Sequence, residues 1–294
     1  MRITVCTPTY NRQYTLEKLY LSLKRQSFHN FEWIVVDDGS TDNTEELFEQ
    51  YLADENFFPI RYVKTENGGK HRAINKGVQM AQGELFFIVD SDDYITDNAL
   101  ETINQVERTI PVENKHRYGG ICGLKGQNEM SIIGSTFDGN YLDITMLERP
   151  KYKIFGDKAE VFYTEVLRKY PFPEYDGEKF VTECVVWDKI AADGYLLRFH
   201  NHISIICNYL SDGLTANGLD KYKNSPKGWG LYIYQSVRFG KLRGLEKWNA
   251  YLKYFYVMKG SMSFLNIAKN LHCTPAELWI GLFGLRFFYK IYDR

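Results

Sequence analysis

The chain has 294 residues, of which 44% are hydrophobic and 25% charged, a composition typical of a globular protein with a substantial core. The five cysteines stand singly without a CxxC pair, which excludes a disulfide-stapled miniprotein and favours a reducing compartment. The net charge of −1 predicts no nucleic-acid partner, and the N-terminus lacks the apolar run of a signal peptide, so we expect a cytoplasmic protein.

The near-zero net charge is the sum of two regions of opposite charge. Residues 221–294 hold 13 lysines and arginines and 3 acidic residues, a net of +10, so residues 1–220 hold 23 and 34, a net of −11. Aromatic residues are also denser at this end, with 17 in the last 74 positions against 29 in the first 220. The shift predicts one domain over residues 1–218 and a basic, aromatic-rich helical extension over residues 219–294.

The first hundred residues alternate between apolar runs and amphipathic segments. The apolar runs predict strands over residues 3–7, 33–37, 60–64 and 85–89. Helical spacing predicts helices over residues 16–23, 47–52 and 69–81, the first with Thr15 as its N-cap. This alternation indicates an α/β fold with a mainly parallel central sheet flanked by helices, in which ligands bind beyond the carboxyl ends of the strands.

The pattern weakens in the following hundred residues. It predicts strands over residues 119–124, 143–147 and 203–209, and a helix over residues 182–192. We expect these elements to complete the sheet and to form the far wall of a cleft.

An acidic cluster follows the fourth predicted strand. Asp90, Asp92 and Asp93 place three carboxylates within one turn of the chain, where they repel one another unless a cation or donors offset their charge. Ligands that are all oxygen favour a hard divalent ion such as Mg²⁺ or Mn²⁺. The alternative is a helix cap, with Asp92 or Asp93 opening the next helix.

Two further loops carry polar residues at predicted strand ends. Residues 37–41 fit a turn and an N-cap, and a carboxylate here is equally suited to accept a hydrogen bond from a base or a ribose hydroxyl. Residues 67–71 place two glycines and Lys70 before a helix, where backbone amides and an ammonium suit a phosphate. Such glycine turns are also common without a ligand, and His71 is interpreted as a cap or core residue.

Four motifs occur in a fixed order. They are TPTYNR near the N-terminus, VVDDGSTDNT after the second strand, NGGKHRAINKG in the third helix and DSDD after the fourth strand. Together they resemble the family 2 glycosyltransferases, which have a nucleotide-binding α/β fold called GT-A. The resemblance extends over about residues 1–215 and implies a nucleotide-binding half over residues 1–115 and an acceptor-binding half over residues 116–218.

The resemblance implies a pocket for the nucleotide base after the first strand. Its walls would come from Thr7, Pro8, Tyr10 and Asn11. Asp38, after the second strand, would accept a hydrogen bond from the uracil ring of a UDP-sugar.

The resemblance also implies residues around the diphosphate. Lys70 and Asn75 would lie beside the nucleotide and its phosphates, and Asp90 beside the ribose. Within this DxD motif Asp92 would bind Mn²⁺ or Mg²⁺, and Asp93 would share that task.

The candidate general base is Glu183. Members of the family often carry an acidic pair at the start of this helix, and Cys184 replaces the second acid here. A working base needs a pKa raised by its surroundings. The alternatives for this role are Asp176, Glu178 and Asp188.

The implied activity is an inverting, metal-dependent transfer of a hexose from a UDP-sugar to a hydroxyl of a glycan or polyprenyl-linked acceptor in surface polysaccharide biosynthesis. One rival is a sugar-nucleotide nucleotidyltransferase, although residues 7–12 hold none of the glycines of its phosphate loop. Another is a non-catalytic module that binds a nucleotide or a partner protein. Residues 212–215, DGLT, form either a loop that closes over the donor or an ordinary turn.

The C-terminal extension allows two interpretations. Basic residues beside aromatic ones fit helices that lie on the inner face of the cell membrane as a peripheral contact. The alternative is a helical bundle that packs on the catalytic domain or on a second subunit of a homo-oligomer. The last helix, residues 278–290, is too short for a transmembrane span.

Overall fold

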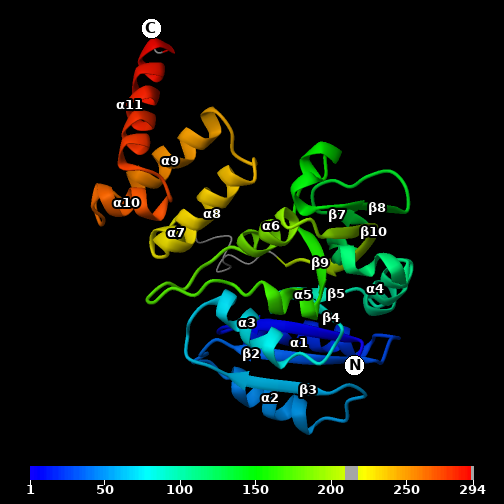
Figure 1. The fold of residues 1–294 in the computed structure, drawn as a ribbon. Coiled ribbons are helices and arrows are strands. Elements are labelled where there is room, and N and C mark those ends of the chain that lie inside the picture. Colours follow the sequence, from blue (N-terminus) through cyan, green and yellow to red (C-terminus); the bar gives the residue numbers. More distant parts are fainter. Residues whose placement is uncertain (209–217, 293–294) are drawn as a thin grey trace.

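The computed structural model describes residues 1–208 and 218–292, with side chains described as far as Gly284. A ten-stranded sheet forms the centre, helices cover both of its faces, and the C-terminal helices lie to one side (Figure 1). The strands are β1 (Ile3–Thr9), β2 (Phe31–Asp37), β3 (Ile60–Lys64), β4 (Leu85–Ile88), β5 (Tyr94–Ile95), β6 (Tyr118–Asn128), β7 (Ser131–Ile132), β8 (Tyr141–Ile144), β9 (Lys158–Tyr163) and β10 (Leu196–Ile206).

The helices alternate with the strands and then follow one another at the C-terminal end. They are α1 (Gln13–Lys24), α2 (Thr44–Ala53), α3 (Lys70–Met80), α4 (Ala99–Arg108), α5 (Thr164–Lys169), α6 (Cys184–Ala192), α7 (Asp220–Lys223), α8 (Pro226–Arg238), α9 (Leu245–Met258), α10 (Phe264–Asn270) and α11 (Pro275–Tyr292). Two short 3₁₀ segments are η1 (Val112–Arg117) and η2 (Met146–Tyr152).

The sheet has the strand order β3-β2-β1-β4-β9-β6-β10-β5. The first four strands are parallel, as the sequence predicted, so their carboxyl ends meet at one edge. Strand β9 pairs antiparallel with both β4 and β6, whereas β6 and β10 are parallel. The sheet is therefore parallel in its first half and mixed in its second half, where the expected parallel arrangement does not continue.

Strand β1 lies between β2 and β4 and is buried at all seven positions. A strand covered by helices on both faces reads as a continuous apolar run, which is why it was recognisable. It extends two residues beyond its predicted end, because β2 continues beside it to the pair Thr9–Asp37. Pro8 fits there because pairing with β4 has already ended at Cys6–Ile88, so its missing N–H is not needed on that side.

The sheet separates two hydrophobic cores. Helices α1, α2 and α4 cover one face around the fully buried Trp33 and Phe87, and helices α3, α5 and α6 cover the other around Phe86. Helix α3 approaches β1 closely because residue 77 is glycine, and a Cβ there would lie 2.4 Å from Sγ of Cys6. This packing holds the start of α3 at the carboxyl edge of the parallel strands.

Two predicted helix starts differ from the structure. Helix α1 has Arg12 as its N-cap residue, and Thr15 lies inside the first turn, where its hydroxyl donates to the Arg12 carbonyl. Helix α4 has Asn98 as its N-cap residue. Asp92 and Asp93 therefore do not cap a helix, and that alternative for the acidic cluster is wrong.

The elements of the second half were the least predictable. Strand β10 begins at Leu196, well before the predicted start at residue 203, because polar residues around His200 interrupt its apolar pattern. Strand β8 ends at Ile144, and the 3₁₀ segment η2 begins two residues later at Met146, where a strand was expected to continue.

Helices α7–α11 pack around a hydrophobic cluster of their own, which includes the fully buried Tyr254 and Leu271. The hydroxyl of Tyr254 donates to the carbonyl of Pro226 at 2.9 Å and ties α9 to the start of α8. The division into domains at residues 218 and 219 stays a prediction. Among the described helices, none combines the length and apolarity that crossing a membrane requires.

Candidate functional site

The carboxyl edge of the parallel strands gathers three charged side chains from distant parts of the sequence. Lys70 is the first residue of α3, Asp90 follows β4, and Glu183 is the N-cap residue of α6. The Nζ of Lys70 lies 2.7 Å from Oδ1 of Asp90 and 2.7 Å from Oε1 of Glu183. One ammonium therefore bridges two carboxylates that were predicted to have different roles, Asp90 beside the ribose and Glu183 as the general base.

This bridge fixes the charge of all three groups. Burial by itself raises the pKa of Glu183, but the Lys70 ammonium and its hydrogen bond outweigh burial, and the net shift is downward. The pKa of Asp90 is lowered by the same balance of burial against Lys70. Burial lowers the pKa of Lys70, and the two carboxylates more than reverse it. Glu183 is thus ionised in this arrangement, and the expectation that its surroundings raise its pKa is wrong here.

The acidic cluster is compact enough for one ion. Oxygen atoms of Asp90, Asp92 and Asp93 all lie within 4.8 Å of one another. Asp93 is engaged by the end of β10, because it accepts from Sγ of Cys207 at 3.4 Å and from the backbone N–H of Asn208 at 3.1 Å. Within residues 1–208 and 218–284, the Asp92 carboxylate has no such hydrogen bond from another side chain. All-oxygen donors at this spacing fit a hard divalent cation.

Lys125, in β6, is a further charged residue at the cluster that the sequence analysis missed. Its Nζ lies 3.6 Å from Oδ2 of Asp93, and its side chain is only 16% exposed. Burial raises the pKa of Asp93 to about 6, with Lys125 acting in the opposite direction and the neighbouring aspartates adding to the rise. The one available signal was a lysine inside the otherwise apolar strand sequence GGICGLKG.

The loop after β1 is pinned to the loop after β2. The backbone N–H of Asn11 donates to Oγ of Ser40, and Oδ1 of Asn11 accepts from the backbone N–H of Thr41, both at 2.8 Å. Asn11 has a positive φ of 51°, which asparagine tolerates better than most residues. Beside it, the ring of Tyr10 is 47% exposed, so it offers an aromatic surface at the carboxyl edge.

Thr7 does not line this loop. It lies within β1, is fully buried, and its Oγ1 accepts from Nε1 of Trp33 at 3.0 Å in the hydrophobic core. Its hydroxyl is therefore engaged in the core, and its place in the base pocket stays a prediction. Pro8 is also buried within the strand, so its contribution to a pocket is limited to the shape of the wall.

The loops after β2 and β3 meet at Asp38. The Asp38 carboxylate accepts from the backbone N–H groups of Gly68 at 2.7 Å and Gly69 at 2.8 Å, and from Nδ2 of Asn67 at 3.1 Å. The two glycine amides that the sequence offered to a phosphate are thus already used. A carboxylate has about four acceptor sites, so Asp38 retains room for one more donor.

The side chain of Asn75 forms hydrogen bonds within the protein. Its Oδ1 accepts from the backbone N–H of Phe172 at 2.9 Å, and its Nδ2 donates to the Phe172 carbonyl at 2.9 Å and to Glu174 at 2.8 Å. Both amide hydrogens are used in this way, so Asn75 anchors the segment before α6 and is not placed to bind a donor.

The other carboxylates considered as the base are placed differently from Glu183. Glu178 is buried and accepts two backbone N–H groups in the first turn of α8, both at 2.9 Å. Asp188 pairs with Nζ of Lys241 at 2.6 Å, and Asp176 is exposed to solvent. Glu183 is therefore the carboxylate of this segment that faces the acidic cluster. Residues 212–215 lie outside the described residues.

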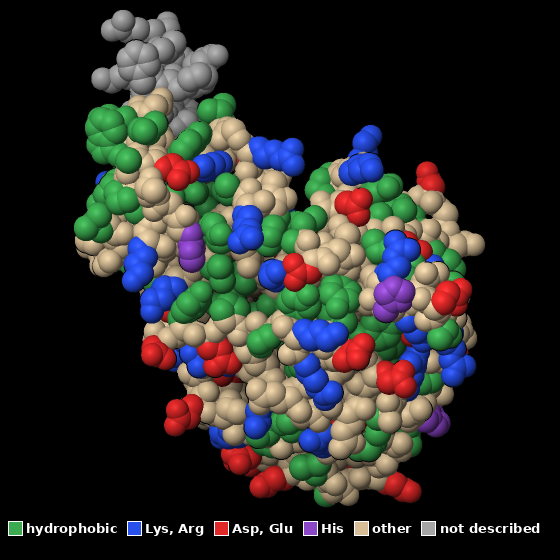
Figure 2. Space-filling view, in the orientation of Figure 1, with side chains coloured by type: hydrophobic (Ala, Val, Ile, Leu, Met, Phe, Trp, Pro, Cys, Tyr) green, Lys and Arg blue, Asp and Glu red, His purple; other side chains and the backbone are tan. Residues whose placement is uncertain are grey.

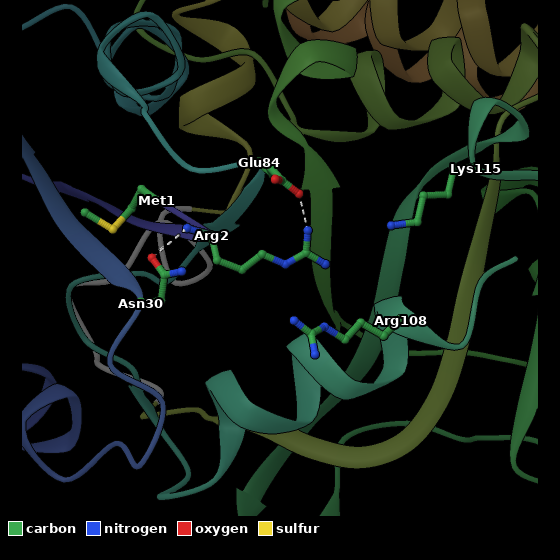
Figure 3. A pocket seen from close by; sticks show the side chains of 6 residues that line it. All are labelled: Met1, Arg2, Asn30, Glu84, Arg108 and Lys115. Carbon is green, nitrogen blue, oxygen red and sulfur yellow. Dashed lines mark hydrogen bonds and ion pairs between the residues drawn. The ribbon is translucent and has the colours of Figure 1, made fainter. Parts of the chain in front are cut away.

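A separate cavity of about 370 Å³ lies at the opposite edge of the sheet (Figure 3). The residues that line it come just before β1, β2 and β4 or from the end of α4 and η1: Met1, Arg2, Asn30, Glu84, Arg108 and Lys115. Arg2 pairs with Glu84 and with the buried Glu107, and Lys115 pairs with Glu107 at 2.6 Å. In a sheet of this kind ligands bind at the carboxyl edge, so this cavity is not the donor site.

The sequence model of glycosyl transferase family 2 matches residues 4–106, which include Lys70 and the acidic cluster. Residues 4–106 form a glycosyl transferase family 2 domain. This match weighs against the nucleotidyltransferase alternative. A relative in Haemophilus influenzae, described as an uncharacterized glycosyltransferase, is 26% identical over 258 residues, which cover 86% of this chain and 97% of the relative.

Two further relatives carry more specific names. The poly(ribitol-phosphate) β-N-acetylglucosaminyltransferase TarS of Staphylococcus aureus is 32% identical over 149 residues, 50% of this chain and 25% of TarS. The GalNAc(5)-diNAcBac-PP-undecaprenol β-1,3-glucosyltransferase of Campylobacter jejuni is 29% identical over 194 residues, 63% of this chain and 58% of the relative. The chain thus spans only part of both.

The fold agrees with the family. The crystal structure of TarS residues 1–349 with UDP-GlcNAc superposes with a TM-score of 0.60 at 20% identity, covering 97% of this chain and 92% of that one. The predicted GT-A fold is confirmed. At this level of identity the likeness establishes the fold alone.

Proposed function

We propose that the chain is an inverting, divalent-metal-dependent glycosyltransferase that moves a hexose from a UDP-sugar to a hydroxyl of a glycan or lipid-linked acceptor in bacterial surface polysaccharide synthesis. The observation that carries the proposal is the arrangement of Lys70, Asp90 and Glu183 at the carboxyl edge, with Asp92 and Asp93 beside them. The names of TarS and of the Campylobacter relative support the donor and acceptor classes.

The acidic cluster is suited to a divalent cation by its net charge. Asp90, Asp92, Asp93 and Glu183 face two lysines, Lys70 and Lys125, so the ionised cluster carries an excess of negative charge. Asp92 is the principal ligand, with Asp93 as the second. A Mn²⁺ or Mg²⁺ ion held there supplies positive charge to the departing diphosphate, a contribution of several kcal/mol.

Glu183 is the general base of the proposal. It accepts the proton of the acceptor hydroxyl while that oxygen forms its bond to C1 of the sugar and the bond from C1 to the diphosphate breaks. The electron pair of the broken bond leaves with UDP. Because the acceptor attacks from the face opposite the diphosphate, the configuration at C1 is inverted.

Lys70 couples the general base Glu183 to the diphosphate of the donor. Its ammonium already pairs with Glu183, and a diphosphate offers it a competing partner of higher charge. Transfer of Lys70 toward the phosphates removes the group that lowers the pKa of Glu183 and leaves that carboxylate more basic when the donor is in place. Tyr10, Asn11 and Asp38 would contact the uracil.

A donor panel tests the proposal. The chain is incubated with UDP-hexoses and UDP-N-acetylhexosamines, with and without Mn²⁺, and UDP release and thermal shift are measured. We expect one donor to be bound and turned over only with the metal, and the α-linked donor to give a β-linked product by NMR. Pyrophosphate release from UTP and a sugar phosphate would identify a nucleotidyltransferase, and donor binding without turnover a non-catalytic module.

A further inference from the structure

The C-terminal helices form an apolar groove on their outer surface. It has a volume of about 250 Å³ and lies between α9, α10 and α11. The residues that line it include Leu252, Phe255, Tyr256, Phe264, Trp279 and Phe283. The groove is far in sequence from the acidic cluster, and none of its lining residues belongs to the candidate site.

Helix α11 carries apolar residues on a second face, besides the face that packs on α9. Leu278 is fully buried, and a Cβ at Gly281 would lie 2.2 Å from the ring of Trp248, so this face is closely packed on α9. Trp279 and Phe283 are nevertheless 54% and 50% exposed, and their ring centroids lie 4.2 Å apart. The described residues thus leave about half of each of these two side chains uncovered, and exposed apolar surface of this kind marks a binding face.

The rim of the groove is positively charged. Nζ of Lys259 lies 4.4 Å from the centre of the Tyr256 ring, directly at the groove, and Lys253 is exposed on the same helix. Figure 2 shows hydrophobic side chains gathered over the α11 end of this region with lysine or arginine side chains beside them. The whole segment 221–294 carries a net charge of +10, from 13 basic and 3 acidic residues.

Exposed aromatic side chains beside a basic rim favour a membrane surface as the partner. Aromatic side chains that enter the headgroup region, flanked by lysines that reach anionic phosphates, are the determinants of binding at a membrane interface. A second copy of the chain would bring another strongly basic segment against the first, which is electrostatically unfavourable.

We propose that this groove docks on the surface of an anionic phospholipid bilayer, with Trp279 and Phe283 inserted among the headgroups and Lys259 beside a lipid phosphate. The interaction is independent of the proposed transfer reaction, so either proposal can fail without the other.

Vesicle co-sedimentation of the full chain tests the docking. Vesicles of phosphatidylcholine alone are compared with vesicles that also contain phosphatidylglycerol, and the matched control is Leu245→Ser, because Leu245 is 52% exposed on α9 but outside the groove. We expect wild type and the control to bind the anionic vesicles. The double variant Trp279→Ser, Phe283→Ser should lose about tenfold or more in affinity, and Lys259→Gln about fivefold.

Three results would overturn the docking. One is equal binding, or none, to the two kinds of vesicle. Another is a loss of vesicle affinity in Leu245→Ser as large as the loss in the double variant. The third is a wild-type dimer in sedimentation equilibrium that the double variant converts to monomer without any vesicle binding, which would assign the groove to self-association. Thermal unfolding of each variant checks its fold, and the exposed Lys259→Gln keeps the test informative if the double variant is unstable.

Discussion

The ammonium of Lys70 lies 2.7 Å from the carboxylate of Glu183, although 112 positions separate the two residues in the sequence. The same ammonium contacts Asp90, so the candidate base and the acidic cluster share one counter-ion. In this arrangement Glu183 is ionised but held in an ion pair, which weakens it as a base. Proton transfer to Glu183 therefore requires the donor to draw Lys70 away first.

Replacement of Lys70 separates its two proposed effects. In Lys70→Met the pKa of Glu183 should rise, because burial remains while the lowering by the ammonium is lost. UDP affinity should fall roughly tenfold through loss of a charged contact. The acid limb of the pH–rate profile should move to higher pH. Lys76→Met, at an exposed position on the same helix, is the control. Equal behaviour of the two variants in calorimetry and kinetics would contradict the role of Lys70.

The two proposed metal ligands, Asp92 and Asp93, should differ in their effect on metal affinity. Asp92→Asn should raise the Mn²⁺ concentration needed for half-maximal activity by about tenfold or more, because among the described residues no other side chain donates a hydrogen bond to this carboxylate. Asp93→Asn should raise it less, since Cys207, Asn208 and Lys125 already engage Asp93. Mn²⁺ titrations of UDP release measure both, and the reverse order would reassign the principal ligand.

The Gly69 position should be intolerant of any side chain. Gly69 has a φ of +99°, and a Cβ there would lie 1.9 Å from the backbone oxygen of Lys179, on the segment that leads to Glu183. Gly69→Ala should therefore destabilise the fold and lower kcat. Gly139→Ala is a matched control, with a φ of +106° and nothing within 4 Å, and should cost only backbone strain of about 1–3 kcal/mol. Similar unfolding free energies and rates in both variants would disprove the steric argument.

The buried His71 predicts a pH dependence of stability. Burial, with a smaller effect of Arg72, lowers the pKa of His71 to about 4 from 6.5. Between these values the unfolded chain binds a proton that the folded chain does not, so stability falls as the pH drops from 6.5 toward 4. The loss amounts to roughly 3 kcal/mol at most.

Urea unfolding at pH 7 and pH 4.5 measures this dependence. His71→Phe should show a smaller decrease in unfolding free energy between the two pH values than wild type. Part of the wild-type decrease remains in the variant, because burial also lowers the pKa of His200, to about 3. Identical decreases in unfolding free energy in wild type and His71→Phe would show that His71 does not contribute to the pH dependence of stability.

The sequence predicted the parallel half of the sheet well because its inner strands, β1, β2 and β4, are largely buried on both faces. Strands such as β2 read as continuous apolar runs, and glycine and polar residues mark their ends. Strand β9 gave no comparable signal: its sequence, KAEVFY, mixes charged and apolar residues, and it pairs with β4 and β6 across long sequence distances. Pairing at that range is not encoded in any short pattern.

The sequence pointed to most charged residues that meet at the candidate site, although not to Lys125, and it did not predict their contacts. The motifs pointed to Lys70, the acidic cluster and Glu183, yet nothing in them indicated that one lysine joins two carboxylates. The aspartate and glycine motifs around Asp38 and Gly69 were assigned separate ligands, whereas the structure joins them to each other. Hydrogen-bond partners depend on loop packing, so a polar residue assigned to a ligand from sequence can prove to be already satisfied within the protein.

The most direct test of the account is Glu183→Gln, assayed for both transfer and UDP binding with Mn²⁺. We expect kcat to fall by about 10²–10⁴-fold, because the proton acceptor is lost. UDP should be bound at least as tightly as by wild type, since Lys70 no longer pairs with Glu183. Transfer at the wild-type rate by the glutamine variant would contradict the role of Glu183 as the base.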